Sequence, residues 1–231
     1  NNNAIVHYQK FSLRLILCTA CSSRPTAYRK HTAALEKDSV HRKVFEYVNI
    51  MAILEIYTGY VLGGVMISRT LFGTTPDGLP AYTYTLAAGS QEVVLTDFGA
   101  AITSISIPDA AGKKSDIVLG FDKLEDYFDN PACYGMTVGP SANRTDKAEV
   151  PLAGHIYHLP KNDGPTKQNN LHTDLEHGLH KRLWDAEIDE EANSVVFSLR
   201  LDDGTFGLPG NRSLHARYTL KEIPEGAELL L

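Results

Sequence analysis

The chain has 231 residues, of which 43% are hydrophobic and 22% charged, and its formal net charge at pH 7 is -6. These values are typical of a globular protein with a core of its own and exclude an intrinsically disordered chain. The negative charge disfavours nucleic acid and anionic membranes as partners. An odd set of three cysteines favours a reducing compartment, and we expect the cytoplasm.

Residues 1–65 differ in character from the rest of the chain. They hold 8 basic and 4 acidic side chains, whereas residues 66–231 hold 14 and 24. Only one of the 11 prolines, Pro25, precedes residue 66, so turn-forming residues are scarce in this part. We interpret 1–65 as a leader of uncertain origin, with Met66 as the natural start and the preceding residues as non-native read-through.

Two apolar runs in the leader offer alternatives to that interpretation. Residues 11–21 resemble the core of a short signal peptide, but Arg14 interrupts the run and no cleavage site is clear. Residues 48–67 approach the length that spans a bilayer, but Glu55 and several polar positions weaken the resemblance. We therefore expect neither secretion nor a membrane anchor.

From residue 67 onward, short apolar segments alternate with Gly, Pro, Asp and Asn, which is typical of an antiparallel all-β protein. Strict alternation of apolar and polar residues over 214–220 predicts a strand with one buried face. The segment 123–130 is expected to form one or two helical turns. Further strands are predicted at 92–96, 102–107, 116–120, 134–138, 150–152, 156–159, 183–188 and 195–201.

The chain ends on the apolar run 228–231, without a turn or a polar tail. Such an end is typical of a strand interrupted inside a sheet, which leaves a neighbouring edge unpaired. We therefore expect a β domain that is incomplete at its C-terminus.

The densest polar cluster spans residues 162–184 and contains three histidines within nine positions, His172, His177 and His180. Three such residues are candidate zinc ligands, but their spacing matches no usual zinc pattern. We expect no metal site. For His177 and His180, exposed positions in a solvated loop are the better interpretation.

A second polar cluster follows the bend at Gly139-Pro140. Asn143 and Arg144 offer an amide and a rigid guanidinium group, which suit an oxygen-rich ligand such as a sugar. An Arg paired with an acidic neighbour, beside an Asn that closes its own turn, is an equally supported alternative. The chain contains no phosphate-binding loop, dinucleotide-binding glycine motif or serine-hydrolase elbow. The sequence therefore does not indicate phosphate binding, dinucleotide binding or serine hydrolysis.

Several segments, in order and spacing, resemble the aldose 1-epimerase (galactose mutarotase) family. They are SRTLFGTTPDG at 68–78, DFGAAITSISIPDAAGK at 97–113, DIVLGFDKLEDY at 116–127, G-x-x-A-N-R at 139–144, NNLH at 169–172, GLHKRLW at 178–184 and DDGTFGLPGN at 202–211. The resemblance implies that 66–231 is the N-terminal portion of a large antiparallel β-sandwich domain.

The resemblance also implies a reaction, the interconversion of the α and β anomers of a free hexose through its ring-opened form. A base removes the proton of the anomeric hydroxyl while an acid protonates the ring oxygen, with no cofactor or metal. By motif, Asn143 and Arg144 correspond to contacts with sugar hydroxyls. His172 corresponds to a catalytic histidine near the ring oxygen. We expect these three side chains to converge on one pyranose-sized hollow.

Departures from the family pattern concern both activity and specificity. The family's acid histidine and base glutamate are expected beyond residue 231. Pro140 and Ser141 depart from the common Gly-Arg-Val-Ala-Asn-Arg form, and Thr173-Asp174 replaces a frequent Gly-Gly, which bears on substrate preference. A noncatalytic carbohydrate-binding protein, or an inactive fragment of the same fold, is the alternative function.

Overall fold

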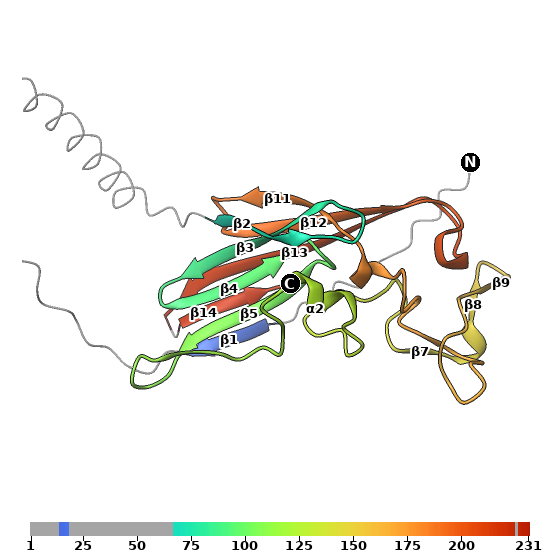
Figure 1. Ribbon diagram of the computed structural model, residues 1–231, viewed down its shortest axis with the longest axis horizontal. Helices are drawn as coiled ribbons and strands as arrows, with labels where there is room; N and C mark the ends of the chain where they lie inside the picture. The colour runs from blue at the N-terminus through green and yellow to red at the C-terminus, as the bar shows by residue number, and fades with distance from the viewer. Residues whose placement is uncertain (1–13, 19–66, 225) are drawn as a thin grey trace, which may run out of the picture.

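The structure is a computed structural model that describes residues 14–18, 67–224 and 226–231 (Figure 1). The apolar run 48–66 and most of 11–21 lie outside the described residues, so neither targeting interpretation is tested. The strands are β1 (Arg14–Cys18), β2 (Ser68–Thr74), β3 (Pro80–Ala88), β4 (Gln91–Thr96), β5 (Ala101–Pro108), β6 (Lys114–Asp116), β7 (Arg144–Thr145), β8 (Glu149–Leu152), β9 (His155–His158), β10 (Asn170–Leu171), β11 (Asp185–Asp189), β12 (Ser194–Leu201), β13 (Arg212–Ile223) and β14 (Gly226–Leu230). The helical elements are α2 (Leu124–Phe128) and the 3-10 turns η1 (Asp146–Ala148), η2 (Leu179–Lys181) and η3 (Thr205–Gly207).

Two five-stranded antiparallel sheets form the body of the molecule. One has the order β2-β3-β4-β5-β6, and the other has the order β1-β14-β13-β12-β11. The ladders β7/β10 and β8/β9 are separate, and β7, β8 and β9 lie at one end of the sandwich (Figure 1). This architecture confirms the predicted all-β fold.

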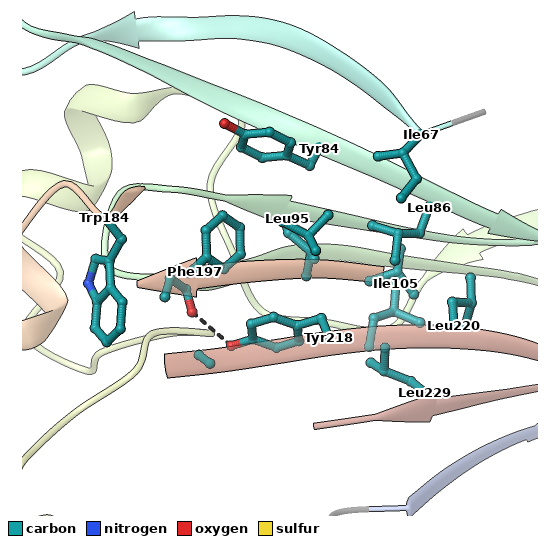
Figure 2. Close-up of a cluster of buried hydrophobic side chains, with 14 of the residues drawn as sticks. Ile67, Tyr84, Leu86, Leu95, Ile105, Trp184, Phe197, Tyr218, Leu220 and Leu229 are labelled. Carbon is teal, nitrogen blue, oxygen red and sulfur yellow. Dashed lines mark hydrogen bonds between the residues drawn. The ribbon is translucent and has the colours of Figure 1, made fainter. Parts of the chain in front are cut away.

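The core lies between the two sheets, where period-two alternation places one apolar face of each strand (Figure 2). Leu86 and Leu95 from the first sheet and Phe197 from the second are completely buried. The Phe197 ring packs edge to face against Tyr84 and Tyr218, with ring centroids 5.6 and 5.9 Å apart. Each buried side chain of this size contributes roughly 1.5–3 kcal/mol through removal of apolar surface from water.

Two predicted strands are wrong. The strand expected over 116–120 is instead the short β6, because the Asp116 carboxylate accepts the backbone N–H groups of Ile105 (3.1 Å) and Val118 (3.0 Å). Beyond Asp116, one backbone bond to β5 remains, from the Ile117 N–H to the Ile105 carbonyl at 3.0 Å. The segment 134–138 forms turns and irregular structure rather than a strand.

At the end of the chain, β14 confirms the strand that the apolar run predicts. It pairs with β13 on one side and with β1 on the other, from Arg14 opposite Leu230 to Cys18 opposite Gly226. Along these five positions β14 therefore has no open edge. No helix in the described part of the chain is long and apolar enough to cross a membrane.

Candidate functional site

The short β7/β10 ladder brings the three predicted residues together. Arg144 lies opposite Leu171, and one step further along the ladder Asn143 lies beside His172. The backbone N–H of His172 donates to the Asn143 carbonyl at 3.1 Å. In return, the backbone N–H of Asn143 donates to Nδ1 of the His172 ring, also at 3.1 Å. The ladder register therefore places these three residues next to one another.

The hydrogen bond to Nδ1 assigns the proton of the neutral His172 ring. A ring nitrogen that accepts an N–H bond carries no proton, so in the neutral imidazole the proton lies on Nε2. Asn143 and His172 both have left-handed backbones, with φ of 60° and 55°. These conformations turn both segments at the end of the ladder and leave Nε2 as the nitrogen available to donate to a ligand.

Arg144 is held by one nitrogen only. Its Nε donates to Oδ2 of Asp163 at 2.8 Å, with the side chains 62% and 20% exposed. Among the described residues no further hydrogen bond engages its guanidinium group, so the two terminal amino groups remain for an external acceptor. The ion pair is the kind that the sequence left open as an alternative to ligand binding, and the geometry accommodates both.

The segment leading to Asn143 is tied to the beginning of β5. The backbone N–H of Ile102 donates to the Gly135 carbonyl at 2.9 Å, and that of Thr137 donates to the Gly99 carbonyl at 3.0 Å. The Thr137 hydroxyl also donates to the carbonyl of Ala100 at 2.9 Å. These bonds fasten the irregular segment to a strand of the main sheet, so the candidate site rests on a rigid element.

The segment carrying His172 is fixed by buried polar side chains. Asn170 and Thr173 are both completely buried. The Thr173 hydroxyl accepts the N–H of Ser141 at 2.8 Å and donates to the Ser141 carbonyl at 3.0 Å. The sequence marked Ser141 and Thr173 only as departures from a family pattern. Asn170 lies in the family-like segment 169–172 but was not singled out, and Asp163 was not singled out either.

The other two histidines of the polar cluster occupy different environments. His177 is exposed, as predicted, with 73% of its side chain accessible. The prediction for His180 is wrong, because η2 turns its ring inward until only 1% is exposed. Burial, together with the charges of Lys181 and His172, lowers the pKa of His180 to about 4. No group of three or more metal-ligating side chains lies together in the described segments.

A separate hollow of about 450 Å³ lies beside α2, with Phe98, Phe128 and Leu183 among its apolar lining residues. Its two cations already have partners. Lys181 Nζ donates to the Phe128 carbonyl at 2.8 Å, and Arg182 Nε donates to the His177 carbonyl at 2.9 Å. The three predicted residues do not line this hollow. Asn143 and Arg144 are exposed and His172 is half-buried. That the three side chains share one pyranose-sized hollow stays a prediction.

Comparison with known proteins identifies the class to which this fold belongs. The sequence pattern of the family described as aldose 1-epimerase matches residues 82–224. Rattus norvegicus galactose mutarotase is 36% identical over 168 residues, which are 72% of this chain and 46% of that protein. Escherichia coli aldose 1-epimerase is 34% identical over 148 residues, 64% of this chain and 41% of that protein.

Solved structures agree with these sequence matches. A C. elegans aldose epimerase homologue superposes with a TM-score of 0.56 at 31% identity, covering 62% of this chain and 42% of its own. A galactose 1-epimerase from Lactobacillus acidophilus gives a TM-score of 0.55 at 27% identity, covering 67% and 44%. The chain belongs to the aldose 1-epimerase family. It spans about half the length of the curated relatives that it matches.

Proposed function

We propose that this protein is an aldose 1-epimerase that interconverts the α and β anomers of a free hexose. Asn143, Arg144 and His172 bind the sugar, and His172 takes part in the proton transfers. The observation that carries the proposal is the pair of hydrogen bonds between Asn143 and His172, which holds Nδ1 as an acceptor and so leaves the proton of the neutral ring on Nε2. Membership in a family whose relatives are named mutarotases supports the same reaction.

The chemistry assigned to these residues follows from their donors. The terminal amino groups of Arg144 and the Asn143 side-chain amide donate to hydroxyl oxygens of the sugar. The Nε2–H of His172 donates to an oxygen of the sugar ring and so stabilises the negative charge that develops there on ring opening. The family's base is expected beyond residue 231, so in the 231-residue chain the proton of the anomeric hydroxyl passes to solvent water. Placing these donors on a hydrogen-bonded ladder reduces the entropy lost when the sugar binds.

We also propose that the protein acts in the cytoplasm on a small-molecule sugar, without a nucleic acid partner. The odd number of cysteines supports a reducing compartment, and Cys133 is free in the structure. The net charge of -6 disfavours polyanions.

Polarimetry on freshly dissolved α-D-galactose and α-D-glucose tests the proposal on the full 231-residue chain. The optical rotation is expected to relax faster than in buffer alone. His172→Ala should remove most of the acceleration, because it deletes the Nε2–H donor. His177→Ala, an exposed histidine in the same segment, serves as the control and should leave the rate unchanged.

Two results would contradict the proposal. Relaxation at the buffer rate would refute catalysis by this chain, and galactose binding seen by saturation-transfer NMR in the same sample would then favour a noncatalytic carbohydrate-binding protein. Equal losses in the two histidine variants would refute the role given to His172.

A further inference from the structure

Thr173 has a backbone conformation that its side chain disfavours. Its φ is +67°, in the left-handed region where a β-branched residue is an outlier. Such a conformation persists only where surrounding contacts hold it, and it is most frequent at functional sites. The contacts that hold Thr173 therefore indicate the structural role of this strained residue.

Those contacts are complete on every polar atom. The Thr173 hydroxyl bonds to both backbone groups of Ser141, at 2.8 and 3.0 Å. Its backbone N–H donates to Oδ1 of Asn170 at 3.0 Å, and its carbonyl accepts from Nδ2 of Asn170 at 2.6 Å. Nδ2 also donates to the Pro160 carbonyl at 2.6 Å. Because Asn170 and Thr173 are completely buried, water does not compete for these bonds.

These bonds join the two segments that carry the site. Ser141 lies two residues before Asn143, and Thr173 directly follows His172. The Ser141–Thr173 bonds and the Asn143–His172 bonds therefore close one ring of contacts around the histidine. The β7/β10 ladder holds Asn143 and His172 together from one side, and the Ser141–Thr173 bonds hold them from the other. Without the Ser141–Thr173 bonds, the N–H of Asn143 is held against Nδ1 from one side only.

We propose that the Thr173 hydroxyl is a positioning group for His172, and that it holds the two segments in the register that keeps Nδ1 as acceptor and Nε2 as donor. Thr173 touches no substrate in this arrangement and acts only through the histidine. The effect of Thr173 on turnover rests on the proposed function. Its effect on the tautomer of the His172 ring can be measured on the protein alone, without substrate.

Three substitutions separate the hydroxyl from the backbone strain. Thr173→Val keeps the branched shape and removes the hydroxyl. Thr173→Ser keeps the hydroxyl and removes the methyl group. Thr173→Gly removes the hydroxyl and also relieves the left-handed backbone, so it folds even if the valine variant does not.

Nitrogen-15 NMR of the His172 ring, recorded on the full chain without sugar and assigned with His172→Ala, gives the deciding measurement. Wild type and Thr173→Ser are expected to show one tautomer with the proton on Nε2. Thr173→Val and Thr173→Gly are expected to show an average of two tautomers. The proposal would be overturned by a wild-type spectrum in the glycine variant. It would also be overturned if the serine variant averaged the two tautomers as much as the valine and glycine variants do.

Kinetics supply a second readout. In the valine and glycine variants, the mutarotation kcat should fall about tenfold while KM stays within about twofold. The reason is that Nε2–H of His172 is no longer held as the proton donor, whereas the contacts of Asn143 and Arg144 with the sugar hydroxyls remain. Equal changes in kcat and KM would contradict a positioning role. A wild-type chain without turnover would refute the proposed function, while the ring spectra would still decide the role of Thr173.

Discussion

Asp97 is a buried carboxyl group that accepts hydrogen bonds from two tyrosine residues. It is 4% exposed, and its oxygens accept the backbone N–H of Tyr82 at 2.8 Å and the hydroxyl of Tyr84 at 3.2 Å. Burial raises its pKa from 3.8 to about 6 despite these bonds. Between these values the folded chain binds a proton that the unfolded chain has released. The free energy of unfolding therefore falls as the pH rises through this range, by roughly 3 kcal/mol.

His180 produces the opposite dependence. Its pKa falls from 6.5 to about 4 on folding, so between these values the unfolded chain binds the proton that the folded chain has lost. The free energy of unfolding therefore rises with pH over this range, again by roughly 3 kcal/mol. The contributions of Asp97 and His180 oppose each other between about pH 4 and pH 6.

Single substitutions should expose the two opposing contributions. In Asp97→Asn the free energy of unfolding is expected to rise with pH between about 4 and 6, and in His180→Gln it is expected to fall, relative to the wild-type slope. Urea titrations at several pH values measure these slopes independently of the absolute loss of stability in either variant. Parallel curves for all three proteins would show that neither group titrates as described.

At the scale of elements, the junction between β5 and the segment leading to Asn143 depends on Gly135. An added Cβ there would lie 1.9 Å from the backbone oxygen of Ile102, and φ is +67°. Neither the overlap nor the backbone angle can be relieved without breaking the bond from Ile102 to Gly135. The glycine is therefore required for the contact that anchors the site to the sheet.

Gly135→Ala is expected to lower the free energy of unfolding by about 3 kcal/mol or more. Gly112→Ala is the matched control, since Gly112 also has a positive φ, +80°, but has no neighbouring atom within 4 Å of an added Cβ. It should cost only about 1 kcal/mol through backbone strain. Chemical unfolding measures both values, and equal losses would contradict the steric explanation.

Strands could be predicted where apolar and polar residues alternate, or where short apolar segments lie between turn-forming residues. The pattern over 214–220 identified β13, and the strands predicted at 150–152 and 156–159 correspond to the β8/β9 hairpin. The segments 116–120 and 134–138 are apolar enough to resemble strands. Their backbone groups bond instead to the Asp116 side chain and to separate points around β5, which no local pattern reveals.

The candidate site could be predicted only in part for a similar reason. Motif resemblance located Asn143, Arg144 and His172 in the sequence, and the β7/β10 register explains why they meet. The partnership of Arg144 with Asp163 depends on that same pairing between distant segments. His180 was misplaced because its burial is set by the packing of η2 rather than by its polar neighbours in the sequence.

For the molecule as a whole, two packed sheets provide the rigid body, and β7, which begins the candidate site, lies at one end of it (Figure 1). This division is common because loops vary while a buried core holds them in place. The central claim is that Asn143, Arg144 and His172 together form one sugar site at this end.

Titration of the nitrogen-15-labelled full chain with D-galactose, followed by amide chemical shifts, tests that claim most directly. The account predicts that the shifts concentrate at residues 143–144 and 170–173 and vanish in Arg144→Ala. Shifts that concentrate instead around the hollow beside α2, or that survive unchanged in Arg144→Ala, would contradict it.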